Sequence, residues 1–148
     1  MVAVELLILL IASICDIHTR TVPLSLTPVA IGATTFYLLF EYMQTGNTAS
    51  IFVSFGCGIG ILTFFYISMK LTKIGGADCL IASTIGFSLG CYGLWALLFA
   101  FLLNLPYVAA LKVQKNEHEY PFVPFLTAGY IGALIFMCQQ GISFAWLF

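Results

Sequence analysis

Residues 16–23 read Asp16-Ile17-His18-Thr19-Arg20-Thr21-Val22-Pro23. This polar stretch ends one apolar run and precedes another, and the chain of 148 residues as a whole is 61% hydrophobic and 7% charged. A soluble domain is about one quarter charged, and a protein of this size has too little interior to bury so much apolar surface. The composition therefore predicts an integral membrane protein, folded as a single membrane-embedded domain over residues 1–148.

Turn-forming or charged residues separate the apolar runs of the chain into six expected helices. These are residues 2–16, 24–42, 49–69, 78–90, 92–111 and 123–146. The fourth and fifth runs are kept apart, because one helix over both would far exceed the ~20 residues that a crossing needs. The expected fold class is all-α, a polytopic membrane bundle of six transmembrane helices.

The basic residues predict the orientation of this bundle. His18 and Arg20 lie in the first loop, and the lysines occupy the third and fifth loops at positions 70, 73, 112 and 115, whereas the second loop carries Glu41 and no base. Because basic loops favour the cytoplasm, we expect these three loops inside and both termini outside, in the plasma membrane. The net charge of −1 argues against nucleic acid as a partner and leaves membrane lipids as the expected surroundings.

The predicted topology places two aspartates at one depth. Asp16 ends the first helix as it reaches the cytoplasmic side, and Asp78 begins the fourth helix as it leaves that side. An ionisable residue at the edge of a membrane span is costly, so it is a candidate for function. Two carboxyl groups that share one proton suit aspartyl proteolysis, in which one accepts a proton from water and the other donates to the scissile carbonyl.

The residues before Asp78 fit this chemistry. Gly75 and Gly76 permit a close approach of a peptide to the start of the fourth helix, where unpaired N–H groups offer partial positive charge. Plainer interpretations stay open for each aspartate alone. Asp78 is also a plausible helix cap after a glycine turn, and Asp16 a solvated helix end paired with Arg20.

The five cysteines show neither a CxxC motif nor a Cys/His cluster with zinc spacing, so we expect no metal and no cofactor. Cys57, Cys91 and Cys138 lie inside apolar runs and are interpreted as small packing residues. Cys15 and Cys79 adjoin the aspartates but are not interpreted as nucleophiles.

Three stretches carry a resemblance to a known family. They are Asp16-Ile17-His18-Thr19-Arg20-Thr21-Val22-Pro23, Gly75-Gly76-Ala77-Asp78 and Tyr120-Pro121-Phe122-Val123-Pro124-Phe125-Leu126-Thr127-Ala128-Gly129. In this order, and with six expected helices, the chain resembles the prepilin and preflagellin (archaellin) peptidases, which are membrane aspartyl proteases with a GxGD-type motif. The second stretch is the variant with Ala77 where many members have Gly.

The resemblance implies a substrate and a set of site residues. Members of the family cleave the short basic leader from prepilins, archaellins or similar precursors on the cytoplasmic side, just before the hydrophobic segment. Asp16 and Asp78 correspond to the catalytic pair. The residues that correspond to supporting positions of the motifs are Gly75, Gly76, Ala77, Arg20, Pro23, Pro121 and Pro124.

The chain departs from the family at a few positions. Leu24 stands where Asn is frequent, and Cys79 stands where Lys is frequent. The long cytoplasmic insert with CxxC motifs, which bifunctional members use to N-methylate their product, is absent, so no methyltransferase activity is expected. Two other functions remain as alternatives, namely a proton-coupled transporter with the aspartates as a relay and a non-catalytic assembly subunit of the pilus or archaellum.

Overall fold

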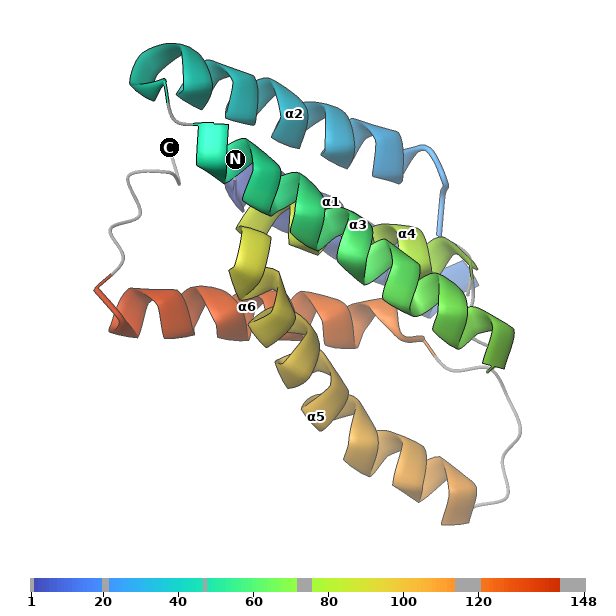
Figure 1. Cartoon of the computed structure of the whole chain (residues 1–148). Coiled ribbons are helices and arrows are strands. Elements are labelled where there is room, and N and C mark those ends of the chain that lie inside the picture. Colours follow the sequence, from blue (N-terminus) through green and yellow to red (C-terminus); the bar gives the residue numbers. More distant parts are fainter. Residues whose placement is uncertain (1, 20–21, 47, 72–75, 114–120, 142–148) are drawn as a thin grey trace.

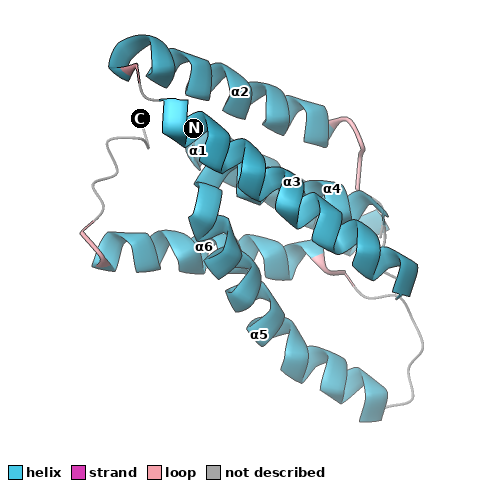
Figure 2. Ribbon diagram, viewed as in Figure 1, coloured by secondary structure: helices cyan, strands magenta, loops and turns pink. Residues whose placement is uncertain are grey.

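The computed structural model describes residues 2–19, 22–46, 48–71, 76–113 and 121–141, and within them it is helical, without strands (Figures 1 and 2). The helices are α1 (Val2–Thr19), α2 (Leu26–Thr45), α3 (Thr48–Leu71), α4 (Gly76–Leu89), α5 (Gly93–Val113) and α6 (Val123–Gln139), and a short 3-10 turn, η1 (Gly90–Tyr92), joins α4 to α5. The predicted all-α class is confirmed.

Each expected helix overlaps one observed helix, and all ends but one lie within three residues of the prediction. α1 continues through Asp16 to Thr19, so this aspartate lies in the last turn of the helix and not at its end. α6 was predicted to reach residue 146, but it ends at Gln139, and residues 142–146 lie outside the described part. The reason is Gly141, which adopts a left-handed conformation with φ of 71° and donates its N–H to the Cys138 carbonyl at 3.1 Å.

Three stretches are long and apolar enough to cross a membrane. These are Val2–Thr19, Thr48–Met69 and Gly76–Ala110, and α6 is a shorter apolar helix. The chain is thus a membrane protein by the length and composition of its helices. The number of crossings and the side of each terminus stay predictions.

The longest apolar stretch, 35 residues from Gly76 to Ala110, does not form one helix. It breaks at Gly90, whose φ of 56° is accessible to glycine and strained for residues with a side chain. The 3-10 turn that starts there redirects the chain into α5. The expected separation of the fourth and fifth helices is confirmed, although no charged residue marks the break.

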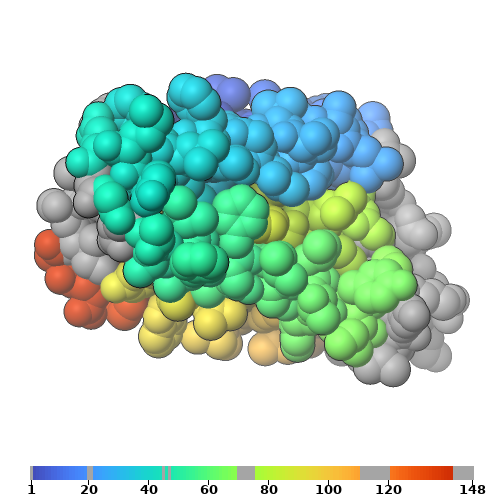
Figure 3. Space-filling view, turned by 45° about the horizontal axis from the view of Figure 1, so that its top comes forward, coloured from blue at the N-terminus to red at the C-terminus, as the bar shows by residue number. Residues whose placement is uncertain are grey.

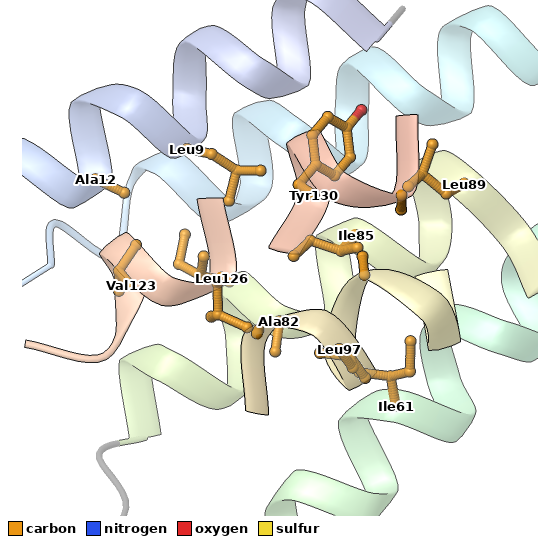
Figure 4. Close-up of a cluster of buried hydrophobic side chains, with 14 of the residues drawn as sticks. Leu9, Ala12, Ile61, Ala82, Ile85, Leu89, Leu97, Val123, Leu126 and Tyr130 are labelled. Carbon is orange, nitrogen blue, oxygen red and sulfur yellow. The ribbon is translucent and has the colours of Figure 1, made fainter. Parts of the chain in front are cut away.

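α4 is the centre of the molecule, since it contacts each of the other five helices. It packs most extensively against α3, and α5 packs most extensively against α6, while α1 lies against α6. Figure 4 shows the core that results, in which Leu9 of α1, Ile85 of α4 and Leu126 and Tyr130 of α6 lie in one cluster. All four side chains are buried.

The two largest helix contacts depend on glycines. A Cβ added to Gly129 of α6 would lie 2.2 Å from the Ala96 carbonyl oxygen and 2.7 Å from the Ala100 nitrogen of α5. A Cβ added to Gly58 of α3 would lie 2.5 Å from the ring of Phe87 on α4. Small residues allow such close backbone approach between membrane helices, so these glycines determine how near the helices pack.

The outer faces of α2 and α3 carry large apolar side chains that are exposed, among them Phe36, Met43 and Phe52. Figure 3 shows these two helices side by side across one face of the molecule. A soluble monomer rarely exposes so many large apolar residues, whereas a lipid environment covers them. The surface therefore agrees with the membrane character of the helices.

Candidate active site

Asp16 lies in the last turn of α1 and is 7% exposed. Its Oδ2 accepts a hydrogen bond of 3.0 Å from the backbone N–H of Val123, the first residue of α6. The Phe122 amide also interacts with this carboxyl group. The aspartate is therefore not a solvated helix end, because it is buried and held by the start of another helix.

The start of α6 explains why the Val123 amide is available, because the first N–H groups of a helix have no carbonyl partner within the helix. The N–H groups of Phe125 and Leu126 donate to the Phe122 carbonyl at 3.0 and 3.3 Å, and Pro124 has no N–H to offer. Val123 donates outside its own helix, to Asp16. The positive end of the helix dipole faces the carboxyl group at the same point.

Asp78 is the third residue of α4 and is partly buried. Its carboxyl group lies close enough to that of Asp16 for the charge of one to act on the other, and α1 packs against α4. The structure thus places two carboxyl groups from distant parts of the sequence within electrostatic range of each other. Neither lies in the middle of its own helix, since Asp16 is near the end of α1 and Asp78 near the start of α4.

The supporting residues that the structure describes lie at the start of α4, before α2 and at the start of α6. Gly76 begins α4 and Ala77 packs on the core; a Cβ on Gly76 would meet Met69 Sδ at an ordinary 3.7 Å, so internal packing does not require a glycine there. Pro23 is exposed, and its carbonyl accepts the Leu26 N–H at 3.1 Å in the turn before α2.

The remaining supporting positions are those of the third motif and two that the structure does not describe. Pro121 and Pro124 flank the amide that binds Asp16, so they belong to the same site. Arg20 and Gly75 lie outside the described residues.

Sequence reasoning missed a second contact between α1 and α6, one turn deeper than Asp16. The hydroxyls of Ser13 and Thr127 are 2.6 Å apart and buried, and the Thr127 hydroxyl also reaches the carbonyls of Leu9 and Val123 at 3.2 Å each. This network fixes the distance between the two helices directly beside the Asp16 contact. The threonine stands within the third motif, which was the available signal.

Sequence reasoning also missed Glu5, which is 1% exposed near the far end of α1. The Thr84 hydroxyl of α4 donates to its Oε1 at 2.5 Å. The Tyr130 hydroxyl of α6 lies near Glu5 and Ser88, but it makes no hydrogen bond of ordinary geometry to the described residues. A lone glutamate inside an apolar run was the signal.

The site therefore consists of two carboxyl groups within electrostatic range of each other, one of them bound by a helix N-terminus, inside an apolar helical bundle. A family model described as the type IV leader peptidase family matches residues 3–137. The chain belongs to the type IV leader peptidase family. The resemblance indicated by the three sequence motifs is thereby confirmed.

Membership of the type IV leader peptidase family implies a protease, and the apolar helices add that it is a membrane protein. The match covers α1 to α5 and nearly all of α6, so it includes both aspartates and the third motif. Comparison with curated proteins gave no match, and comparison with solved structures gave none.

Proposed function

We propose that the chain is a membrane aspartic endopeptidase with Asp16 and Asp78 as its catalytic pair. It removes the short basic leader from prepilin-like or archaellin-like precursors at the cytoplasmic face of the plasma membrane. The observation that carries this proposal is that the two carboxyl groups lie within electrostatic range of each other, on helices that pack together, in a chain of the type IV leader peptidase family.

In the proposed reaction, a water molecule between the two carboxyl groups attacks the scissile carbonyl carbon. One carboxylate accepts the proton of this water, and the other carboxyl group, protonated, donates a hydrogen bond to the carbonyl oxygen. The tetrahedral intermediate then breaks its C–N bond as the amine takes up a proton. The Val123 amide supports this role, because a carboxyl oxygen held by a backbone N–H keeps its orientation without rearrangement.

The proposed substrate is amphipathic, with a basic leader in water and a hydrophobic segment in lipid. Asp16 at the end of α1 and Asp78 at the start of α4 suit a scissile bond at the junction of these two parts. A relay for proton transport is less well supported, because its carboxylates are expected near the bilayer midplane along a path.

The proposal excludes N-methylation of the product. Only residues 20–25 join α1 to α2, which leaves no space for the additional cysteine-containing insert of bifunctional members.

The test is leader cleavage of a panel of prepilin and archaellin precursors in membranes that contain the wild type, Asp16→Asn or Asp78→Asn. The amide is nearly isosteric with the carboxyl group but cannot exchange its proton. Glu41→Gln is the matched control, because it makes the same chemical change in α2, outside the site. We expect cleavage by the wild type and the control, and a loss of at least about 1,000-fold with either aspartate variant, as is usual when an essential acid or base is removed.

Cleavage that survives in a well-expressed Asp16→Asn or Asp78→Asn protein would contradict the aspartyl mechanism. A correctly inserted wild type that cleaves no precursor in the panel would count against the peptidase and favour a non-catalytic assembly subunit. Proton flux in proteoliposomes that depends on both aspartates would favour the transporter.

A further inference from the structure

Two thiols lie in contact at the end of α4 that is remote from the aspartates. The Sγ atoms of Cys57, on α3, and Cys91, in η1, are 3.6 Å apart. A disulfide has an S–S bond of about 2.05 Å, so the two sulfurs need to approach by roughly 1.5 Å to bond. Side-chain rotation covers a displacement of this size.

The backbones beside these thiols are held close by packing that does not involve sulfur. The Cys57 carbonyl oxygen would lie only 3.0 Å from a Cβ built on Gly86, and the Gly58 Cα would lie 2.9 Å from it. α3 contacts both α4 and η1. The packing of the helices therefore holds the thiols together, and the contact does not depend on the conformation of a flexible loop.

One of the two thiols can be reached from outside the core. Cys91 is exposed and Cys57 is partly buried. Cys91 also lines a cavity of about 160 Å³ between α2, α3 and η1, and the cavity walls carry hydroxyl groups from Thr34, Ser54, Ser88 and Tyr92. The exposed lining of this cavity is mainly apolar, so the cavity gives a small molecule space beside Cys91 and is not a polar route to its sulfur.

We infer that Cys57 and Cys91 form a modification site at which a disulfide links α3 to the turn between α4 and α5. The co-reactant is a disulfide, either a small molecule or a thiol–disulfide exchange protein. The Cys91 thiolate attacks this disulfide, which forms a mixed disulfide and releases one thiol. The Cys57 thiolate then attacks the Cys91 sulfur and releases the second thiol, so the chain loses two protons and two electrons and the oxidant gains them.

In the proposed topology, the cysteines lie toward different faces of the membrane, and this placement suits a disulfide between Cys57 and Cys91. Cys15 and Cys79 neighbour the two aspartates, which the proposed topology places at the cytoplasmic face, where thiols stay reduced. Cys57 and Cys91 lie toward the opposite face, where disulfides persist. The interpretation of these two residues as mere packing residues is therefore incomplete, because the structure brings their sulfurs into contact.

The test uses the full chain in membranes, with Cys15, Cys79 and Cys138 replaced by Ala so that only Cys57 and Cys91 remain. The protein is treated with a small aromatic disulfide, denatured, and alkylated with N-ethylmaleimide before its mass is measured. We expect the mass to fall by two hydrogens with no maleimide adduct, and both adducts to appear after reduction. The matched control retains Cys57 and Cys138 in place of Cys91, and it should form no internal disulfide.

A second measurement does not depend on the folding of the cysteine variants. Peptide mapping of the oxidised wild type should identify Cys57 covalently joined to Cys91. The inference is wrong if both thiols of the Cys57/Cys91 protein remain open to alkylation, or if only mixed or intermolecular disulfides form. It is also wrong if the control variant closes an internal disulfide equally well.

Discussion

Three buried polar side chains lie on α1, and each finds its partner on α4 or α6. Glu5 accepts from Thr84, Ser13 bonds Thr127, and Asp16 accepts from the Val123 amide. Glu5 and Asp16 are eleven positions apart, which is about three helical turns, so both lie on one face. Polar contacts along this face fix the position of α1 against its neighbours, and with it the position of Asp16.

The contact between Glu5 and Thr84 makes an asymmetric prediction. In Thr84→Val the buried Glu5 carboxyl group loses its partner, and we expect a loss of about 1–3 kcal/mol in the free energy of unfolding. In Glu5→Leu the Thr84 hydroxyl still bonds the Ile81 carbonyl at 2.7 Å, so the loss should be smaller. Unfolding in mixed micelles measures both.

The double variant Glu5→Leu/Thr84→Val supplies the control for this pair. With neither polar group left, it should recover much of the stability that Thr84→Val loses. A double variant no more stable than Thr84→Val alone would show that the carboxyl group is satisfied in another way.

The sequence identified the acidic side chains of the site, but it did not identify the backbone group that binds one of them. Asp16 and Asp78 were identifiable because carboxylates are rare in this apolar chain. The donor to Asp16 was not identifiable, because it is the N–H of Val123, a residue whose side chain is ordinary. The contact between Cys57 and Cys91 was not predictable from the sequence either, because it depends on how closely α3 approaches α4.

Among the helices, α3 and α4 have the most extensive contact, and glycines lie at its centre. Gly58 faces the Phe87 ring, and the Cα of the same glycine lies against Gly86. α3 has further glycines one turn or less away that face open space, among them Gly60. Only the glycines in the contact are therefore required by packing.

The packing of α3 against α4 predicts that Gly58→Ala lowers stability whereas Gly60→Ala, in the same helix, does not. Gly58→Ala places a methyl group 2.5 Å from the Phe87 ring, and such overpacking should cost about 1–3 kcal/mol in the free energy of unfolding. Gly60→Ala meets nothing within 4 Å and should be neutral or stabilising by up to ~1 kcal/mol, because Ala favours helix.

Thermal unfolding of both proteins in the same detergent provides the comparison. Equal stability of the Gly58→Ala and Gly60→Ala proteins would mean that α3 lies farther from α4 than in this structure.

The six helices were predictable because apolar runs alternate with turn-forming or charged residues, which is a strong signal in a membrane protein. The end of α6 was not, because residues after Gly141 remain apolar and hydropathy continues where the backbone conformation changes. Hydropathy also does not indicate which helices pack against each other. The central place of α4 follows from close-packed small residues, which a single sequence does not distinguish from other glycines and alanines.

For the molecule as a whole, the sequence predicts an orientation that a labelling experiment can check. His18 at the end of α1 and Gln44 at the end of α2 are both exposed, and the proposed topology puts them on opposite sides. In a chain without native cysteines, we expect a membrane-impermeant maleimide to label Gln44→Cys in intact cells. It should label His18→Cys only after permeabilisation. Labelling of both in intact cells, or the reverse pattern, would contradict the orientation.

The bend at Gly90 has a consequence for how the chain is made. An insertion machinery that responds to mean hydropathy alone meets an apolar stretch of 35 residues and no signal for where one crossing ends. That signal is conformational, since Gly90 adopts a positive φ. If a bulky residue there let the two helices run on as one, everything after it would emerge on the opposite side. In the proposed topology, the first turn of α6 would then lie across the bilayer from the aspartate that its amide binds, so we expect Gly90 to be needed for the assembly of the site.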